Sequence, residues 1–215
     1  MHNKHIRIFS LQQVVNAIEY VDKTIEVLFL EGRRDDILNE RYYHHMFSAY
    51  LANLISVEET WKNLAIYPEH PTEMKLSHEN IHLDDVEYTR KFAKDHGKHG
   101  NLDFRIPSNP SISIEWKGPE NCDEQDLAEV FLKLLGEKAS TLKIFVAIFL
   151  TKKGNRDHVP KLKVKIRNSL RFACKVHKIE DLSKMNLYAF IRCRYDIGSK
   201  EISWGAITSI DSSFI

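Results

Sequence analysis

One alternating stretch, residues 101–120, limits most strongly what this chain can fold into, and its sequence is NLDFRIPSNPSISIEWKGPE. On both sides of PSNP, large apolar side chains take the even positions and polar or charged ones the odd positions: Leu102, Phe104, Ile106, Ile112, Ile114 and Trp116 against Asp103, Arg105, Ser113, Glu115 and Lys117. Because successive strand residues point to opposite faces, the alternation predicts a hairpin with one apolar and one charged face. We expect the apolar face to pack on a helix.

Helical patterns precede this hairpin. Ser10 and Gln13 have the spacing of a capping box, and apolar residues then recur at helical intervals as far as Gly32. A second helix is expected over residues 35–55, with a buried stripe that contains Leu38, Tyr42, Met46, Ala49, Tyr50 and Leu54. Residues 72–100 are polar and poorly periodic, so we expect mainly loop there.

Helices and strands alternate after the hairpin. Asp123 is placed to cap a helix that stops at Gly136, and the apolar run KIFVAIFL (143–150) predicts a strand covered on both faces. Pro160 suits the first turn of a further helix, and residues 186–210 predict a terminal hairpin. The expected fold class is therefore α/β (α+β), with a central mixed β-sheet flanked by helices.

Length and composition predict one globular domain over residues 1–215. It would contain an N-terminal helical arm (10–31), a core (35–150), and a basic helix with the C-terminal hairpin (151–215). With 43% hydrophobic and 28% charged residues, the composition is that of a soluble protein. No apolar run of membrane-spanning length and no secretion-signal pattern is present, so we expect a cytoplasmic protein without a membrane partner.

The charged face of the hairpin predicts chemistry. If Pro107 lies opposite Ser111, Asp103 lies opposite Glu115 with Cβ atoms about 4.5–5.5 Å apart. Two carboxylates so close repel by about 3 kcal/mol at an effective dielectric constant near 20, so they need a cation. Lys117 can supply one, and the carboxylates with the backbone carbonyl of Trp116 also suit Mg²⁺ or Mn²⁺. The alternative is an edge hairpin whose outer face is simply charged.

A further carboxylate, Glu40, lies on the second expected helix. At 100° per residue it falls between Phe47 and Leu51, inside the apolar arc and away from the solvent side of Arg41 and His45. Because a buried carboxylate is costly, something must compensate its charge.

The segments NLDF and IEWK, with Asp103, Glu115 and Lys117, resemble the motif of the PD-(D/E)xK nuclease superfamily. The resemblance covers about residues 35–150 and departs from the nominal motif at Leu102, where a proline would stand. It implies a restriction-endonuclease-like core and a Mg²⁺- or Mn²⁺-dependent endonuclease that hydrolyses DNA phosphodiester bonds in restriction, defence or repair. Glu40, in LNERYYHH, matches the helix glutamate that often joins the metal site in this superfamily.

Two other residues are candidates to assist such a site. His44 lies one helical turn after Glu40 on nearly the same face, which suits a contact with the ligands or with a phosphate, although a partly buried structural histidine is the alternative. Arg105 shares the charged face of the hairpin.

Positive charge concentrates in residues 143–178, which contain eleven Lys or Arg and one acid, Asp157, for a net +10 against −9 for the remainder. Such a block is typical of phosphate-binding surfaces, and a solvated helix face is the alternative. DNA is the expected partner, with RNA as an alternative, and the candidate contacts are Lys152, Lys153, Arg156, Lys161, Lys163, Lys165, Arg167 and Arg171.

Two readings compete with a nuclease. The chain can be a nucleic-acid-binding or assembly subunit that keeps the nuclease fold without turnover. It can also be an interaction module that dimerises through the helix over residues 10–31. The sequence leaves open the substrate form, the sequence specificity, the pathway, and whether the chain acts as a homodimer or with a partner subunit.

Overall fold

The computed structural model describes residues 9–30, 40–61, 63–76, 98–118, 123–151, 158–195, 202–203 and 208–209. Their centre is a mixed sheet with the strand order β1 (Tyr67–Leu76), β2 (Lys98–Ile106), β3 (Ile112–Lys117), β4 (Leu142–Thr151), β5 (Leu187–Tyr195) and β6 (Ile202–Ser203). Strands β1, β2 and β3 are antiparallel neighbours, whereas β3, β4 and β5 run parallel. The short strand β7 (Thr208–Ser209) and β6 both pair antiparallel with β5.

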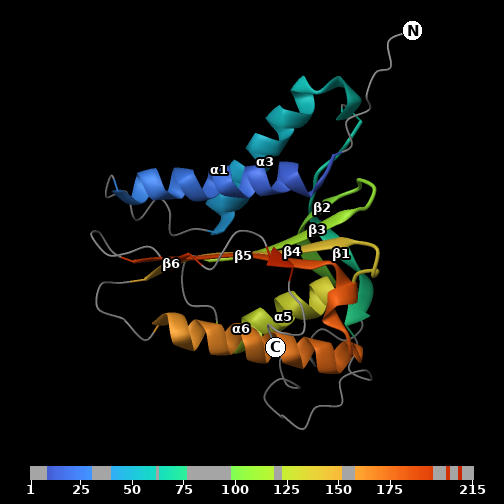
Figure 1. Cartoon of the computed structure of the whole chain (residues 1–215). Helices are drawn as coiled ribbons and strands as arrows, with labels where there is room; N and C mark the ends of the chain where they lie inside the picture. The colour runs from blue at the N-terminus through green and yellow to red at the C-terminus, as the bar shows by residue number, and fades with distance from the viewer. Residues whose placement is uncertain are drawn as a thin grey trace.

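Two helical layers cover the sheet (Figure 1). Helices α1 (Leu11–Leu30) and α3 (Glu40–Val57) lie on one face, and α5 (Glu124–Leu135) and α6 (His158–His177) lie on the other. Two short 3-10 helices, η1 (Glu59–Trp61) and η4 (Leu182–Met185), complete the described elements. The predicted α/β class, a mixed sheet flanked by helices, is confirmed. No helix in the described part of the chain is both long and apolar enough to cross a membrane.

Helix α1 is not an appended arm. Its apolar stripe, which includes Val14, Ile18, Val21 and Ile25, is fully buried in the core cluster that also contains Phe190 of β5. Because the sheet already covers this stripe, the stripe is not available for the dimerisation that one reading of the sequence assigned to the helix. Half of the predicted capping box is present: the Ser10 N–H donates to Gln13 Oε1 over 2.8 Å, but the Gln13 N–H donates to the Ser10 backbone carbonyl and not to its hydroxyl.

The hairpin of β2 and β3 has the predicted register. Phe104 pairs with Ile114, and Ile106 pairs with Ile112, which is the register that sets Asp103 opposite Glu115. The apolar side packs beneath α1 and α3 as expected. Leu102 is an exception, because it joins the core cluster on the α5 and α6 side.

The charged side of the hairpin is covered, which the alternation did not indicate. Helix α5 lies over it, and Ser113 and Glu115 are fully buried. An alternating pattern tells which residues share a face, but it does not tell whether a second layer lies on that face.

Strand β1 was missed because its sequence, YPEHPTEMKL, contains two prolines and no apolar alternation. The strand lies at the edge of the sheet, and of the described strands it pairs only with β2. Proline is tolerated at an edge because the outer backbone groups need no partner in the sheet.

The predicted stripe of α3 is confirmed in part: Met46 is buried and Tyr42, Tyr50 and Leu54 pack partly buried against the core, but the centre of the buried face lies about one residue later. The buried residues are Tyr43, Met46, Phe47, Leu51 and Ile55, whereas Ala49 is exposed. The expected residues 35–39, with Leu38, lie outside the described part of the chain.

The elements after the hairpin agree with prediction. Asp123 caps α5 by accepting from the Asp126 N–H over 2.7 Å, and Gly136 ends that helix. Strand β4 is buried on both faces, and α6 turns Leu162 and Ile166 inward.

Lys143, counted above with the basic segment, belongs to the core. Its side chain is fully buried, and its Nζ donates to the carbonyl oxygens of Lys138, Thr141 and Met185 over 2.7, 3.0 and 2.9 Å. These bonds join the turn after α5 to η4. Burial lowers the pKa of Lys143 to about 8.

This pKa predicts a pH dependence of stability. Between pH 8 and the unfolded value of 10.5, the unfolded chain binds a proton that the folded chain has lost, so the contribution of Lys143 to stability rises with pH. We expect the free energy of unfolding of the wild type, measured in urea relative to Lys143→Met, to increase from pH 8 to pH 10. A constant difference over this range would contradict the lowered pKa.

Candidate functional site

Strands β2 and β3 separate at Asp103. The last pair of the described ladder in this direction is Phe104 with Ile114. Beyond it, the Trp116 N–H donates to Asp103 Oδ2 over 2.6 Å, and the Asp103 N–H donates to Glu115 Oε1 over 3.3 Å. Two carboxylates therefore accept backbone hydrogen bonds at the point where the ladder stops, and Asp103 is fixed between the strands.

Helix α3 brings two more side chains to Asp103. Glu40 and His44 are four residues apart and share one face of the helix. His44 Nε2 lies 3.8 Å from Asp103 Oδ2 and 3.9 Å from Glu40 Oε1. One potential ligand atom from each of these three residues lies within 4.8 Å of the others, and we call this group the Glu40–His44–Asp103 cluster.

Lys117, at the end of β3, lies beside the cluster. Its Nζ is 3.9 Å from Glu40 Oε1, and about a quarter of each side chain is exposed (25% and 29%). The cluster is therefore reachable from solvent at the side where the lysine and Glu40 meet.

The imidazole of His44 is held in place by aromatic rings. It contacts Phe104 and Trp116 at centroid distances of 5.2 and 6.3 Å. Its Nε2 is buried and has no hydrogen-bond partner among the described residues. Burial lowers the pKa of His44, which favours the neutral ring that can donate a lone pair to a metal. The structure thus places a ligand-competent nitrogen between two carboxylates.

The surroundings of Glu40 disfavour its ionised form. Burial is the main cause that raises the pKa of Glu40, Lys117 opposes this increase, and the nearby Asp103 adds to it. A cation bound between the two carboxylates would relieve both the burial cost and the repulsion.

The surroundings of Glu115 differ from those expected for a metal ligand on the charged face of the hairpin. Its carboxylate is completely buried, and Oε2 accepts from Lys133 Nζ over 2.7 Å. Burial raises the pKa of Glu115 to about 8 against the opposing effect of Lys133. The Glu40–His44–Asp103 cluster does not include it. The expected role of Glu115 as a metal ligand stays a prediction. The same is true of the Trp116 carbonyl, since the hydrogen bond between Trp116 and Asp103 uses the Trp116 N–H.

Lys133 was missed by the sequence reasoning. It lies on α5, and its Nζ also donates to the Asn101 carbonyl over 3.0 Å. A signal was present, because the segment FLKLL places one lysine within an otherwise apolar run. A helix that lies over a sheet has little space for an uncompensated charge, so such a lysine calls for a buried acid.

Arg105 does not lie in the cluster. It forms ion pairs with Glu137, which is fully buried, and with Glu73 over 2.7 Å. Ser113 donates to the same Glu137 over 3.3 Å. These residues form a second polar network at the C-terminal end of α5, and its acids compensate the charge of Arg105.

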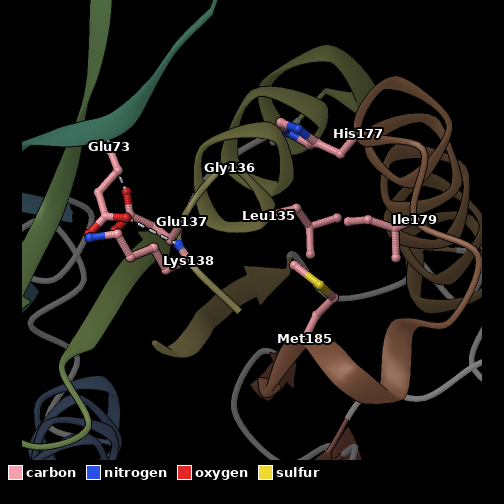
Figure 2. A pocket seen from close by; sticks show the side chains of 8 residues that line it. All are labelled: Glu73, Leu135, Gly136, Glu137, Lys138, His177, Ile179 and Met185. Atoms are coloured by element: carbon pink, nitrogen blue, oxygen red, sulfur yellow. Dashed lines mark hydrogen bonds and ion pairs between the residues drawn. The ribbon is translucent and has the colours of Figure 1, made fainter. Parts of the chain in front are cut away.

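A surface hollow of about 550 Å³ borders this second network. Figure 2 shows Glu73, Glu137 and Lys138 on one side of the hollow, and Leu135, Ile179 and Met185 on the other. None of its lining residues belongs to the Glu40–His44–Asp103 cluster, so the hollow is a separate feature.

The predicted nucleic-acid contacts are only partly described. Lys152, Lys153 and Arg156 lie outside the described residues. On α6, Lys161, Lys163, Arg167 and Arg171 are exposed and Lys165 is half-buried. Helices α6 and α3 cover opposite faces of the sheet, so these cations and the cluster are carried by different layers (Figure 1). Arg192, on β5, pairs with the buried Asp22 over 3.0 Å.

Comparison of the chain with family models, curated proteins and solved structures found no match.

Proposed function

We propose that the chain is a divalent-metal-dependent endonuclease with a restriction-endonuclease-like core, which hydrolyses DNA phosphodiester bonds in restriction, defence or repair. The observation that carries the proposal is the Glu40–His44–Asp103 cluster, with its ligand atoms within 4.8 Å and Lys117 3.9 Å from Glu40. It lies at the strands whose motif resembles the PD-(D/E)xK superfamily. The order of elements, from α3 through the antiparallel β1, β2 and β3 to α5 and the parallel β4, also supports such a core.

The donor atoms of the cluster fit a divalent cation. Carboxylate oxygens suit Mg²⁺ and Mn²⁺, whereas an imidazole nitrogen favours metals later in the transition series over Mg²⁺. A set of two carboxylates and one imidazole therefore suits Mn²⁺ better than Mg²⁺. The unpartnered Nε2 of His44 is the donor that a bound cation would satisfy.

When bound, the cation would polarise the phosphodiester and lower the pKa of a water molecule. In the hydrolysis, the water oxygen forms a new bond to phosphorus, one P–O ester bond breaks, and a proton from the water ends on the released alcohol oxygen. Lys117 is placed to donate to a phosphate oxygen while negative charge develops there. Asp103, fixed by the Trp116 N–H, is placed to orient the reacting groups.

Metal binding can be tested without activity. We expect saturating Mn²⁺ to raise the Tm of the wild type, by the equivalent of about 2.7 kcal/mol at one hundred times the dissociation constant. Asp103→Asn and His44→Gln should lose this increase, and EDTA should reverse it in the wild type. His45→Gln is the matched control, because His45 is the exposed neighbour of His44 on the same helix. The Tm of each variant is measured by calorimetry. An equal increase in Tm in all variants would argue against the cluster as the metal site.

Cleavage tests the function itself. With Mn²⁺ and plasmid or oligonucleotide DNA, Asp103→Asn should abolish cleavage. Lys117→Ala should lower kcat by about 100-fold, since removal of one donor to transition-state charge has effects of about that size. The exposed Lys184, which pairs with Asp181, gives the control Lys184→Ala, expected to cleave as the wild type does. Cleavage by Asp103→Asn at the wild-type rate would sink the proposal.

A second candidate function is a nucleic-acid-binding subunit without turnover. It is favoured by the exposed cations of α6, which lies on the opposite face of the sheet from the cluster. Lys163→Glu with Arg167→Glu should weaken DNA binding and reduce the slope of log affinity against log salt by about 1.8, or about 0.9 for each lost phosphate contact. Lys184→Glu, which makes half of this change in net charge at an exposed lysine outside α6, is the control. If binding is lost in the double variant, while EDTA has no effect and no condition gives cleavage, the second function is the correct one.

A further inference from the structure

Lys133 bridges the two strands where they separate. From α5, its Nζ donates to Glu115 Oε2 on β3 over 2.7 Å and to the Asn101 carbonyl on β2 over 3.0 Å. Among the residues described for β2 and β3, no ladder pair joins the strands at this level. One ammonium group therefore takes over part of the connection that the ladder no longer makes.

Glu115 links Lys133 to Asp103 through two hydrogen bonds. Its two oxygens have different partners, since Oε2 binds Lys133 and Oε1 binds the Asp103 N–H. The backbone around Asp103 is consequently held at two points, the Asn101 carbonyl and the Asp103 N–H, and the Asp103 carboxylate is held at a third by the Trp116 N–H. All three bonds form at the level where β2 and β3 no longer pair.

The aliphatic part of Lys133 has a fixed path. A Cβ atom at Gly100 would lie 3.0 Å from Lys133 Cδ and 3.1 Å from its Cγ. The lysine stem therefore lies against residue 100, and an added methyl group there would require the stem to shift by a few tenths of an ångström.

We propose that Lys133 and Glu115 are positioning residues for the candidate metal site: Lys133 holds Glu115, and Glu115 holds the Asp103 backbone, so that the Asp103 carboxylate faces Glu40 and His44. In this arrangement Glu115 serves Asp103 and is not itself a metal ligand. The inference rests on the proposed function, because the metal site is part of that function. Partners of metal ligands typically change metal affinity by 10–100-fold when they are removed.

The first experiment measures Mn²⁺ affinity of the full chain by calorimetry and by electron paramagnetic resonance of free Mn²⁺. Lys133→Met keeps the stem and removes the donor, and should weaken Mn²⁺ binding by 10–100-fold. Glu115→Gln keeps an acceptor for the Asp103 N–H but turns an NH2 group towards Lys133, so it breaks the link to Lys133 and should weaken Mn²⁺ binding by a factor similar to that of Lys133→Met. In the Glu115→Gln background, Lys133→Met should cost less than it does alone, because the lysine acts through Glu115. Independent, additive losses would overturn the proposal.

A second variant guards against a simple failure to fold. Gly100→Ala keeps both charges but pushes the Lys133 stem, so it should weaken Mn²⁺ binding by a smaller factor than Lys133→Met. Lys184→Met, at an exposed lysine, is the control and should bind as the wild type does. Wild-type Mn²⁺ affinity in both Lys133→Met and Gly100→Ala would overturn the positioning role.

A metal-free measurement separates this inference from the proposed function. In EDTA, the amide hydrogens of Asp103 and Trp116 should exchange at least 10-fold faster in Lys133→Met than in the wild type, relative to the amide of Val146 in β4, which reports on overall unfolding. If the wild type binds no Mn²⁺, the proposed metal function fails, and this exchange ratio still decides whether Lys133 holds Asp103. An unchanged ratio would refute the positioning role.

Discussion

The separation of β2 from β3 at Asp103 is the constraint on which the rest of the site depends. A buried backbone N–H needs an acceptor, and here the carboxylates of Asp103 and Glu115 replace the carbonyls that a continuing ladder would supply. The resulting hydrogen bonds, of 2.6 and 3.3 Å, hold both acids at the point where the strands separate. Helix α5 brings a positive group, Lys133, to Glu115, whereas α3 brings a further acid, Glu40, to Asp103.

The two helical layers surround these acids differently. On the α5 side, Lys133 reaches Glu115 within the protein interior, and that carboxylate has both oxygens bonded. On the α3 side, Glu40 adds a further acid and His44 presents a nitrogen without a hydrogen bond among the described residues. The side with compensated charge is closed, whereas the side with excess negative charge reaches solvent near Lys117. Under the proposed function, a divalent cation would complete the second side, and the first side needs none.

Local patterns allowed much of the fold to be predicted. Alternation gave the hairpin and its register, and the signals at Ser10 and Asp123 gave two helix starts. Prediction was wrong where a neighbour outside the local segment decides the outcome. Leu102 follows the even-numbered pattern but packs with the opposite core cluster, since the strands separate next to it. Strand β1 has no apolar alternation and forms because β2 offers an edge.

The sequence by itself determined which residues can share a face, where helices begin, and that an acid at position 40 would lie towards the interior, because these features follow from repeats of 2.0 and 3.6 residues along one chain. Only the tertiary structure decided that His44 joins Glu40 and Asp103, that Glu115 is enclosed with Lys133, and that Arg105 turns to Glu73 and Glu137. Each of those meetings joins elements far apart in the chain, so it depends on how the layers pack across the sheet. Periodicity along a single segment carries no information about the distance between two segments.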